Sequence, residues 1–307
     1  MNRFAALLVV VATAGLVTGN PVEAQTSCST STLDGVVNVA GEVLNAYVAG
    51  PEPTTLLTVD AGENAIPVDA TTLRGTGTFA EGDLVMILQV QGARIDGREE
   101  GVLNGVYGDG DDDPASPDRQ GVVDDADFTA GTYELNVAAG PIAGNALPLE
   151  APLANSYRAR GAVTDSGNTG IGYQRYQVIR VASFRDLTID AGASLVAAPW
   201  DGRTGGVVAV DVAGTLTVNG VVDASGRGFR GGAPTISTEV DSNQRGVQGE
   251  GIAGTPNRVF SRVGGRVDTT NTYFGAVNER GGPGNAGGTP VRRDSGGGGA
   301  GDRAPGR

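Results

Sequence analysis

The chain has 307 residues, a net charge of −13, and neither lysine nor histidine. This acidic balance excludes the cation-rich surfaces that bind nucleic acid or anionic membranes. The lack of histidine removes the commonest general base and zinc ligand. The single cysteine, Cys28, excludes an intrachain disulfide and a cysteine metal cluster. Glycine accounts for 51 residues and aromatic residues for only 5%, a composition typical of thin, turn-rich β structure.

Residues 1–24 have the pattern of a cleaved export signal. Arg3 precedes an unbroken apolar and small run from Phe4 to Val17, and Val22-Glu23-Ala24 ends on the kind of residue that signal peptidase reads. We expect cleavage after Ala24, which leaves a mature chain without a transmembrane segment. The alternative, an uncleaved anchor, needs about 20 apolar residues to span a bilayer, and this run is shorter. The prediction is therefore an exported bacterial protein, extracellular or at the cell surface.

The rest of the chain divides into four predicted segments and is mainly β. Residues 25–50 are expected to be an extended leading segment, and 51–183 a β-rich domain with an acidic insertion at 109–127. No stretch keeps a helical period over three turns. Short runs of β-branched and apolar residues bounded by turn residues predict strands, at 54–59, 84–90, 133–137 and 176–181.

From residue 184 to 232 the pattern becomes repetitive and predicts a parallel β-solenoid-like segment. Residues 187–198 are echoed at 216–226 in a version two residues shorter, with 205–214 between them. Short strands with single-residue turns and an internal echo are typical of stacked coils. A β-sandwich is the alternative, since its short strands give a similar pattern. Residues 233–307 are rich in Gly, Ser and Asn and poor in large apolar residues, which predicts a flexible tail.

Residues 82–93 (GDLVMILQVQGA), 198–209 (APWDGRTGGVVA) and 224–232 (ASGRGFRGG) carry a resemblance. They resemble the N-terminal region of large secreted, glycine-rich bacterial surface proteins, over roughly residues 80–232. The resemblance implies location and architecture and adds no catalytic residue. The acidic insertion and the short glycine-rich tail depart from that pattern.

The acidic insertion carries the one candidate metal site. Eight carboxylates lie between residues 109 and 127. Alternating acids at the start of a short loop are how calcium loops begin, because Ca²⁺ is held by several converging oxygens. Pro114 and Pro117 interrupt this register, and a second register starting at Ser116 replaces acids by Ser and Gln. The alternative is a solvated acidic loop. The candidate calcium ligands are Asp109, Asp111, Asp113, Asp118 and Asp127.

Other candidate functional residues are weaker. Trp200, the only tryptophan, either stacks on a sugar ring as an exposed aromatic or covers the end of the coils. Paired acids could hydrolyse polysaccharide, and the candidates by position are Asp190, Asp201, Asp211 and Asp223, although acids at such corners usually form turns. Gly226–Gly231 fits a dinucleotide-binding glycine pattern but opens no helix, so we expect no nucleotide.

The leading functional prediction is a secreted or cell-surface structural or adhesive module without catalytic activity or a required cofactor. Its expected partner is a surface or matrix polysaccharide or protein. The first alternative is a calcium-stabilised carbohydrate-binding module. The second is a polysaccharide-acting enzyme with paired carboxylates.

Overall fold

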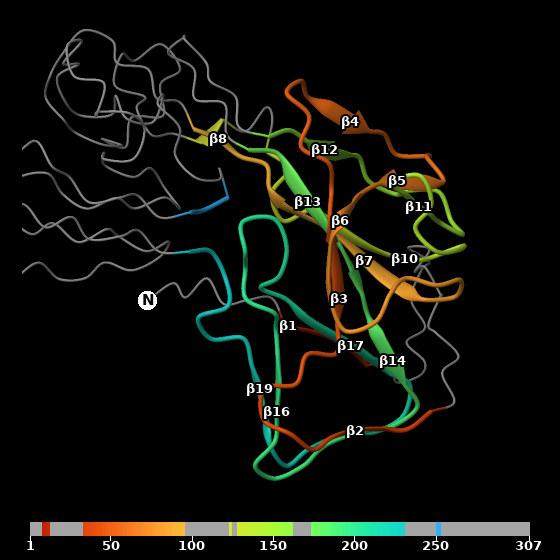
Figure 1. Ribbon diagram of the computed structural model, residues 1–307, viewed down its shortest axis with the longest axis vertical. Helices are drawn as coiled ribbons and strands as arrows, with labels where there is room; N and C mark the ends of the chain where they lie inside the picture. The colour runs from red at the N-terminus through yellow and green to blue at the C-terminus, as the bar shows by residue number, and fades with distance from the viewer. Residues whose placement is uncertain are drawn as a thin grey trace, which may run out of the picture.

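The computed structural model describes residues 8–12, 33–95, 123–124, 128–161, 173–230 and 250–252 (Figure 1). Every regular element in these ranges is a β-strand, which confirms the prediction of a mainly β protein. Among these residues there is accordingly no helix long and apolar enough to cross a membrane.

The centre of the molecule is a five-stranded antiparallel sheet in the order β10-β7-β13-β3-β6. Its strands are β10 (Tyr133–Val137), β7 (Leu84–Gln91), β13 (Arg175–Arg180), β3 (Ala46–Ala49) and β6 (Asp69–Gly75). The inner strand β7 is apolar along most of its length because both of its faces are covered. Val85 and Ile87 point to one hydrophobic cluster, and Met86 and Leu88 to another, as the two-residue period of a strand requires.

Two small antiparallel pairs cover one face of this sheet. They join β4 (Leu57–Val59) to β12 (Tyr157–Ala159), and β5 (Ala65–Pro67) to β11 (Ala146–Pro148). The cluster beneath them includes Ile66, Leu147 and two tyrosines, Tyr157 and Tyr176, whose rings meet edge to face with centroids 5.9 Å apart. A fully buried aliphatic side chain such as that of Ile66 or Leu147 stabilises the fold by about 1.5–3 kcal/mol.

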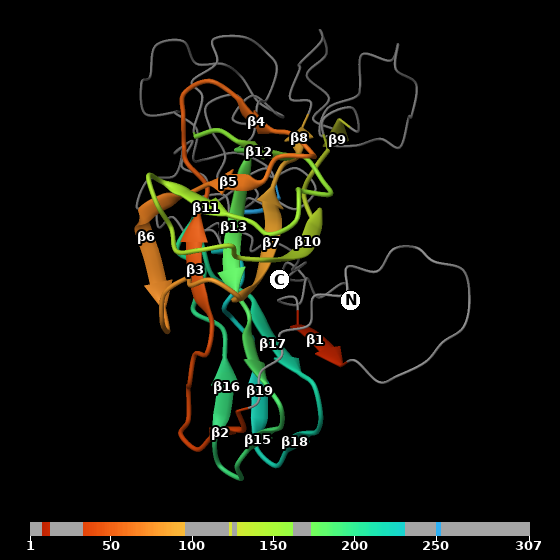
Figure 2. The ribbon, with the colours of Figure 1, turned by 90° about the vertical axis from the view of Figure 1, so that its right-hand side faces the viewer.

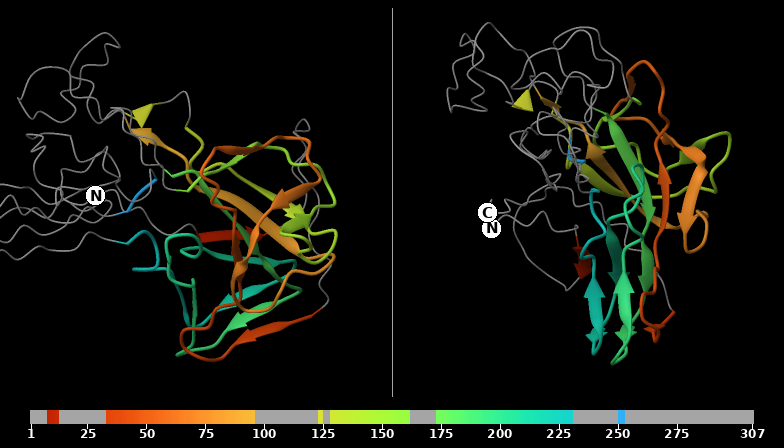
Figure 3. Two further views of the ribbon diagram at one scale, coloured as in Figure 1. Left: turned by 45° about the horizontal axis from the view of Figure 1, so that its top comes forward. Right: turned by 60° about the vertical axis from the view of Figure 1, so that its left-hand side comes forward.

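Short parallel strands lie against the other face. They are β2 (Gly35–Val37), β14 (Ala182–Phe184), β15 (Leu187–Ile189), β16 (Ser194–Val196), β17 (Val208–Val212), β18 (Leu216–Val218) and β19 (Val221–Asp223). β14 pairs with β17, β15 with β18, and β16 with β19, all in parallel. β2 pairs with the opposite edge of β15. Figure 2 shows β2, β15, β16, β18 and β19 below the five-stranded sheet, and Figure 3 gives two further views of this arrangement.

Strand β17 joins the two halves of the molecule. Val208, Val210 and Val212 point into the cluster between the parallel strands, which also contains Ile189 and Leu195. Ala209 on its other face, together with Val207 just before the strand, joins the cluster that contains Tyr47, Met86 and Ile179 of the central sheet. Both faces of β17 are therefore buried, which explains the unbroken apolar run from Val207 to Val210.

Some segments differ in detail from the sequence predictions. The leading segment 25–50 supplies β2 and the fully buried β3, because Tyr47 and Val48 each complete a different cluster. The strand predicted at 54–59 is confined to Leu57–Val59. Within the predicted export signal, β1 (Leu8–Ala12) pairs in parallel with β17.

Two further segments fall in the regions predicted to be irregular. In the acidic insertion, β9 (Val123–Asp124) pairs with β8 (Arg94–Ile95). Of the predicted flexible tail, residues 250–252 are described, and they are packed. Glu250 is 2% exposed, and the carbonyl of Ile252 accepts a hydrogen bond from the Gly92 N–H.

Candidate functional site

Many polar contacts surround the loop 199–206, which connects β16 to β17. The Oδ1 atom of Asp201 accepts hydrogen bonds from the backbone N–H groups of Arg203 (2.8 Å) and Thr204 (2.9 Å), the usual bonding of an Asx turn. Gly205 has a φ of +103°, and a Cβ there would lie 2.6 Å from the carbonyl oxygen of Pro199. Only glycine fits this position.

This loop, which we call the docking loop (residues 199–206), is bonded to the central sheet by side chains that reach its backbone. Gln177 of β13 donates to the Gly205 carbonyl (3.0 Å) and accepts from the Gly205 N–H (2.8 Å). Arg74 of β6 donates to the Pro199 carbonyl (2.6 Å) and to the Thr204 hydroxyl (2.7 Å). The loop therefore has a fixed position on the sheet.

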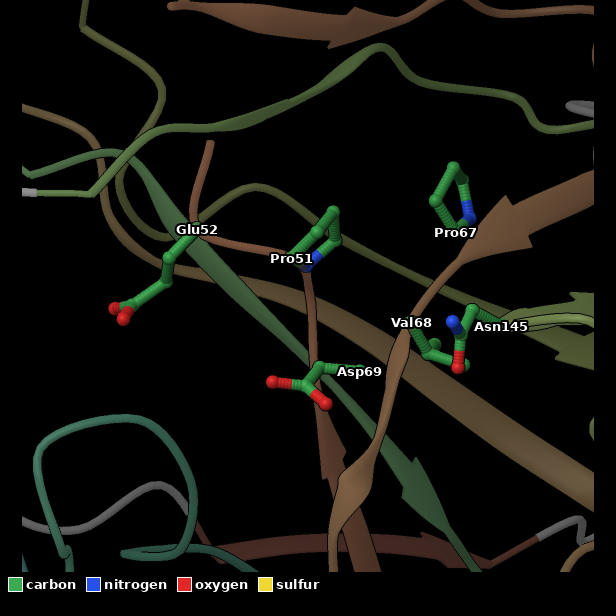
Figure 4. A pocket seen from close by; sticks show the side chains of 6 residues that line it. All are labelled: Pro51, Glu52, Pro67, Val68, Asp69 and Asn145. Atoms are coloured by element: carbon green, nitrogen blue, oxygen red, sulfur yellow. The ribbon is translucent and has the colours of Figure 1, made fainter. Parts of the chain in front are cut away.

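A pocket of about 260 Å³ lies beside the segment that follows β3 and the start of β6. Its lining is Pro51, Glu52, Pro67, Val68, Asp69 and Asn145. Figure 4 shows the carboxylates of Glu52 and Asp69 both turned away from Pro67 and Asn145. Arg203 bridges the two acids, with its Nη1 atom 2.8 Å from Asp69 and its Nε atom 3.6 Å from Glu52. Glu52 also pairs with Arg175 at 2.5 Å.

The charged groups at this pocket hold segments of the fold together and are poorly suited to acid–base catalysis. Hydrogen bonding from the Thr71 side chain, followed by hydrogen bonding from Arg203, lowers the pKa of Asp69. A general acid needs a raised pKa near the working pH, so Asp69 is poorly suited to protonate a leaving group. Arg203 also donates to the Gly50 carbonyl (2.9 Å). The guanidinium thus links two acids and a backbone oxygen, which makes it an ionic connection between loop and sheet.

Trp200 is a packing residue in this structure. It is 5% exposed, its Nε1–H donates to a Glu250 carboxylate oxygen at 3.0 Å, and its ring meets Phe229 edge to face at 5.5 Å. Glu250 in turn pairs with Arg230. The sugar-stacking interpretation of Trp200 is therefore wrong for this fold, because the ring is enclosed by residues from two later segments.

Two of the four candidate corner acids, Asp201 and Asp223, use their side chains to form turns. Asp201 forms the turn described above, and Asp223 accepts from the Ser225 N–H (2.7 Å) in a similar turn. The carbonyl of Asp190 accepts from the Ala193 N–H. Asp211 on β17 is 1% exposed, with no hydrogen-bond partner for Oδ1, and desolvation raises the pKa of its carboxyl.

Sequence reasoning missed the buried amides that hold segments together. Gln89 donates to the Arg158 carbonyl (2.8 Å) and accepts from the Arg158 N–H (2.9 Å). Asn45 bonds in both directions with the backbone of Ala209. The available signal was polarity inside apolar runs, as for Gln89 within 84–90, because a buried amide requires partners.

The predicted calcium ligands Asp109, Asp111, Asp113, Asp118 and Asp127 lie outside the described residues. Within the described ranges, no group of three or more acidic or cysteine side chains is placed to hold a metal ion. Comparison with known proteins found no matching protein family, curated protein or solved structure.

Proposed function

We propose that the chain is an exported structural or adhesive module of the bacterial surface or extracellular matrix, without catalytic activity. In this proposal residues 184–232 form a short parallel β-solenoid-like segment. One observation carries it: β14–β17, β15–β18 and β16–β19 pair in parallel and in the same order along the chain. In a solenoid every coil adds one strand to each face in this way.

The sequence echo agrees with these pairs. Leu187 lies opposite Leu216, and Ser194 lies opposite Val221. The turn between the two faces has four residues in the first copy, 190–193, and two in the second, 219–220. The shorter second copy thus keeps both ladders in register. A sandwich would pair neighbouring strands in antiparallel sheets, so the parallel pairs favour the coil interpretation.

The use of polar side chains supports a structural role. Gln177, Arg74 and Arg203 are all bonded to the backbone of other segments. A catalytic centre instead presents groups that are free to bind and transform a substrate. The proposal implies that the partner is a surface or matrix polysaccharide or protein. The outer surface of this rigid β structure would recognise that partner.

Export and surface location can be tested by expressing the full chain in a bacterial host. We expect mass spectrometry to find Gln25 as the N-terminus and intact cells to expose the protein to added protease. The variant Ala24→Leu should remain unprocessed. A wild-type chain that keeps residues 1–24 in the cytoplasm would contradict the export proposal.

The absence of catalysis has a separate test. The processed chain is incubated with a panel of bacterial polysaccharides, and released reducing ends are measured. We expect no release above that of heat-unfolded protein. Release that disappears in Asp201→Asn or Asp223→Asn would refute the structural proposal and support the paired-acid alternative.

A further inference from the structure

The strand that covers one edge of β17 comes from the predicted export signal. β1 pairs in parallel with β17 over its five residues, from Leu8 opposite Val208 to Ala12 opposite Val212 (Figure 2). β14 pairs with the other edge of β17. β17 is therefore the middle strand of this three-stranded sheet, and the predicted signal supplies one of its two neighbours.

The backbone of β17 shows which of its groups the signal strand pairs with. The N–H and carbonyl of Ala209 bond to the side chain of Asn45, at 3.1 and 2.6 Å. The Asn45 amide also donates to the carbonyl of Arg180, two residues before β14, so these groups of Ala209 face the β14 edge. Because successive residues of a strand direct their backbone groups to opposite edges, those of Val208 and Val210 face β1.

Asp211 places a charge in this otherwise apolar strand. It lies opposite Ser183 of β14 and, on the other edge, opposite Val11 of β1. Asp211 is 1% exposed, and no described residue donates a hydrogen bond to its Oδ1 atom. Burial of an unpartnered carboxylate oxygen is unfavourable. Loss of β1 turns β17 into an edge strand and brings water closer to this carboxylate, so Asp211 weakens the pairing of β1 with β17.

Residues 8–12 cannot serve the fold and the export step at the same time. In a lipid bilayer a single segment satisfies its backbone groups internally, so an apolar signal inserts as a helix. On β17 the same residues are an extended strand, bonded to a distant part of the chain. Two mutually exclusive states of one segment compete, and whatever stabilises one disfavours the other.

We propose that the β1-facing edge of β17 is an intramolecular docking site for the export signal, which withholds the signal from the membrane once the chain has folded. The inference rests on the proposed export, since that proposal assigns residues 1–24 to the signal. Leu8 and Val208 are roughly 200 residues apart, so at about 5–20 residues per second β17 is synthesised about 10–40 s after the signal. The signal is available in this interval, and folding competes for it afterwards.

Hydrogen exchange tests the docked state in two refolded chains, the full chain and residues 25–307. All three hydrophobic clusters lie between Val37 and Ala224, so the shorter chain keeps the whole core. The Val210 amide should exchange roughly tenfold or more faster in the shorter chain, because its strand partner is absent. The Ala209 amide is the internal control, since Asn45 accepts its proton in both chains. Equal protection of the Val210 amide in the two chains would overturn the proposal.

The competition itself is tested with signal peptidase in lipid vesicles. The folded full chain should be cleaved after Ala24 roughly tenfold more slowly than the same chain diluted directly from urea. Asp211→Asn removes the buried charge and leaves the signal unchanged, so it should slow cleavage of the folded chain further and leave the urea-diluted chain unaffected. Asp60→Asn, at an exposed acid outside β17, is the matched control and should behave as the wild type.

The outcomes separate this proposal from the proposed export. Equal cleavage rates of the folded and the urea-diluted chain would refute docking and leave export standing. Cleavage of folded Asp211→Asn at the wild-type rate would refute the role given to Asp211. If even the urea-diluted chain were not cleaved, the export proposal would fail, and the exchange of the Val210 amide would still decide whether residues 8–12 dock on β17.

Discussion

The side-chain amide of Gln177 bonds to the backbone of Gly205 in both directions, at 2.8 and 3.0 Å, and so acts as a strand partner for a residue that has none. Asn45 likewise bonds in both directions with the backbone of Ala209, across the junction between the central sheet and β17. These contacts join the two halves of the molecule through groups that specify geometry, whereas the apolar clusters supply most of the burial energy.

Gln177→Ala should lower the free energy of unfolding by about 2–4 kcal/mol, because it leaves the buried N–H and C=O of Gly205 without partners. Urea unfolding measures the change. Asn219→Ala is the control, since Asn219 is exposed, and its effect should stay within about 0.5 kcal/mol. Equal effects of the two substitutions would show that the amide does not hold the docking loop.

Asp211→Asn should stabilise the protein at neutral pH by roughly 1 kcal/mol, because burial disfavours the charged carboxylate and one oxygen has no partner. The pKa of Asp211 is raised in the folded state above its ordinary value of 3.8. As the pH falls through the folded pKa, the folded protein takes up the proton first and gains stability. The advantage of the variant should therefore shrink on acidification. Thermal melts between neutral pH and pH about 4 test this, with the exposed Asp60→Asn as control.

Asp69→Asn should destabilise the protein by about 1 kcal/mol at neutral pH, a modest effect because part of the side chain is open to solvent. The hydrogen bonds from Thr71 and Arg203 lower the pKa of Asp69 when folded. Its contribution is thus complete above the ordinary pKa and is lost as the pH falls through the lower folded pKa. The free energies of unfolding of the wild type and the variant should become equal in strong acid. A difference that stays constant at every pH would contradict this cause.

Trp200 should report on the packing of residues 250–252. As the only tryptophan and a buried one, it should emit at short wavelength when folded and shift to the red on unfolding. Glu250→Ala removes the acceptor of its indole N–H and should shift the folded emission to the red and increase quenching by acrylamide. Glu63→Ala, at an exposed acid remote in sequence from this contact, should change neither. An unaltered spectrum in Glu250→Ala would contradict the Trp200–Glu250 contact.

Calcium binding by the acidic insertion has a direct test. If Asp109, Asp111 and Asp113 begin a calcium site, with Asp118 and Asp127 as further ligands, millimolar calcium should raise the melting temperature by several degrees relative to chelator. The triple change of 109, 111 and 113 to Asn should abolish that rise. Identical melts of the wild type with calcium and with chelator would reduce the insertion to a solvated acidic loop.

The sequence alone was sufficient to predict strands whose pattern is local. The run 84–90 and the alternation at 133–137 predicted β7 and β10 closely, because a period of two and flanking turn residues act within a few positions. The echo between 187–198 and 216–226 predicted two stacked segments, and β15 and β18, which lie within them, pair in parallel.

What no local pattern could supply is which polar residues become buried and which segments meet. Gln177 and Gly205 are 28 positions apart, and Trp200 and Glu250 are 50 apart. Composition and periodicity predicted the β class and several of the strands and turns, since those depend on neighbours in the chain. The docking loop, the Arg203 connection and the covering of Trp200 were decided by tertiary packing, because the energy of a buried polar group depends on partners that only the fold brings within hydrogen-bonding distance.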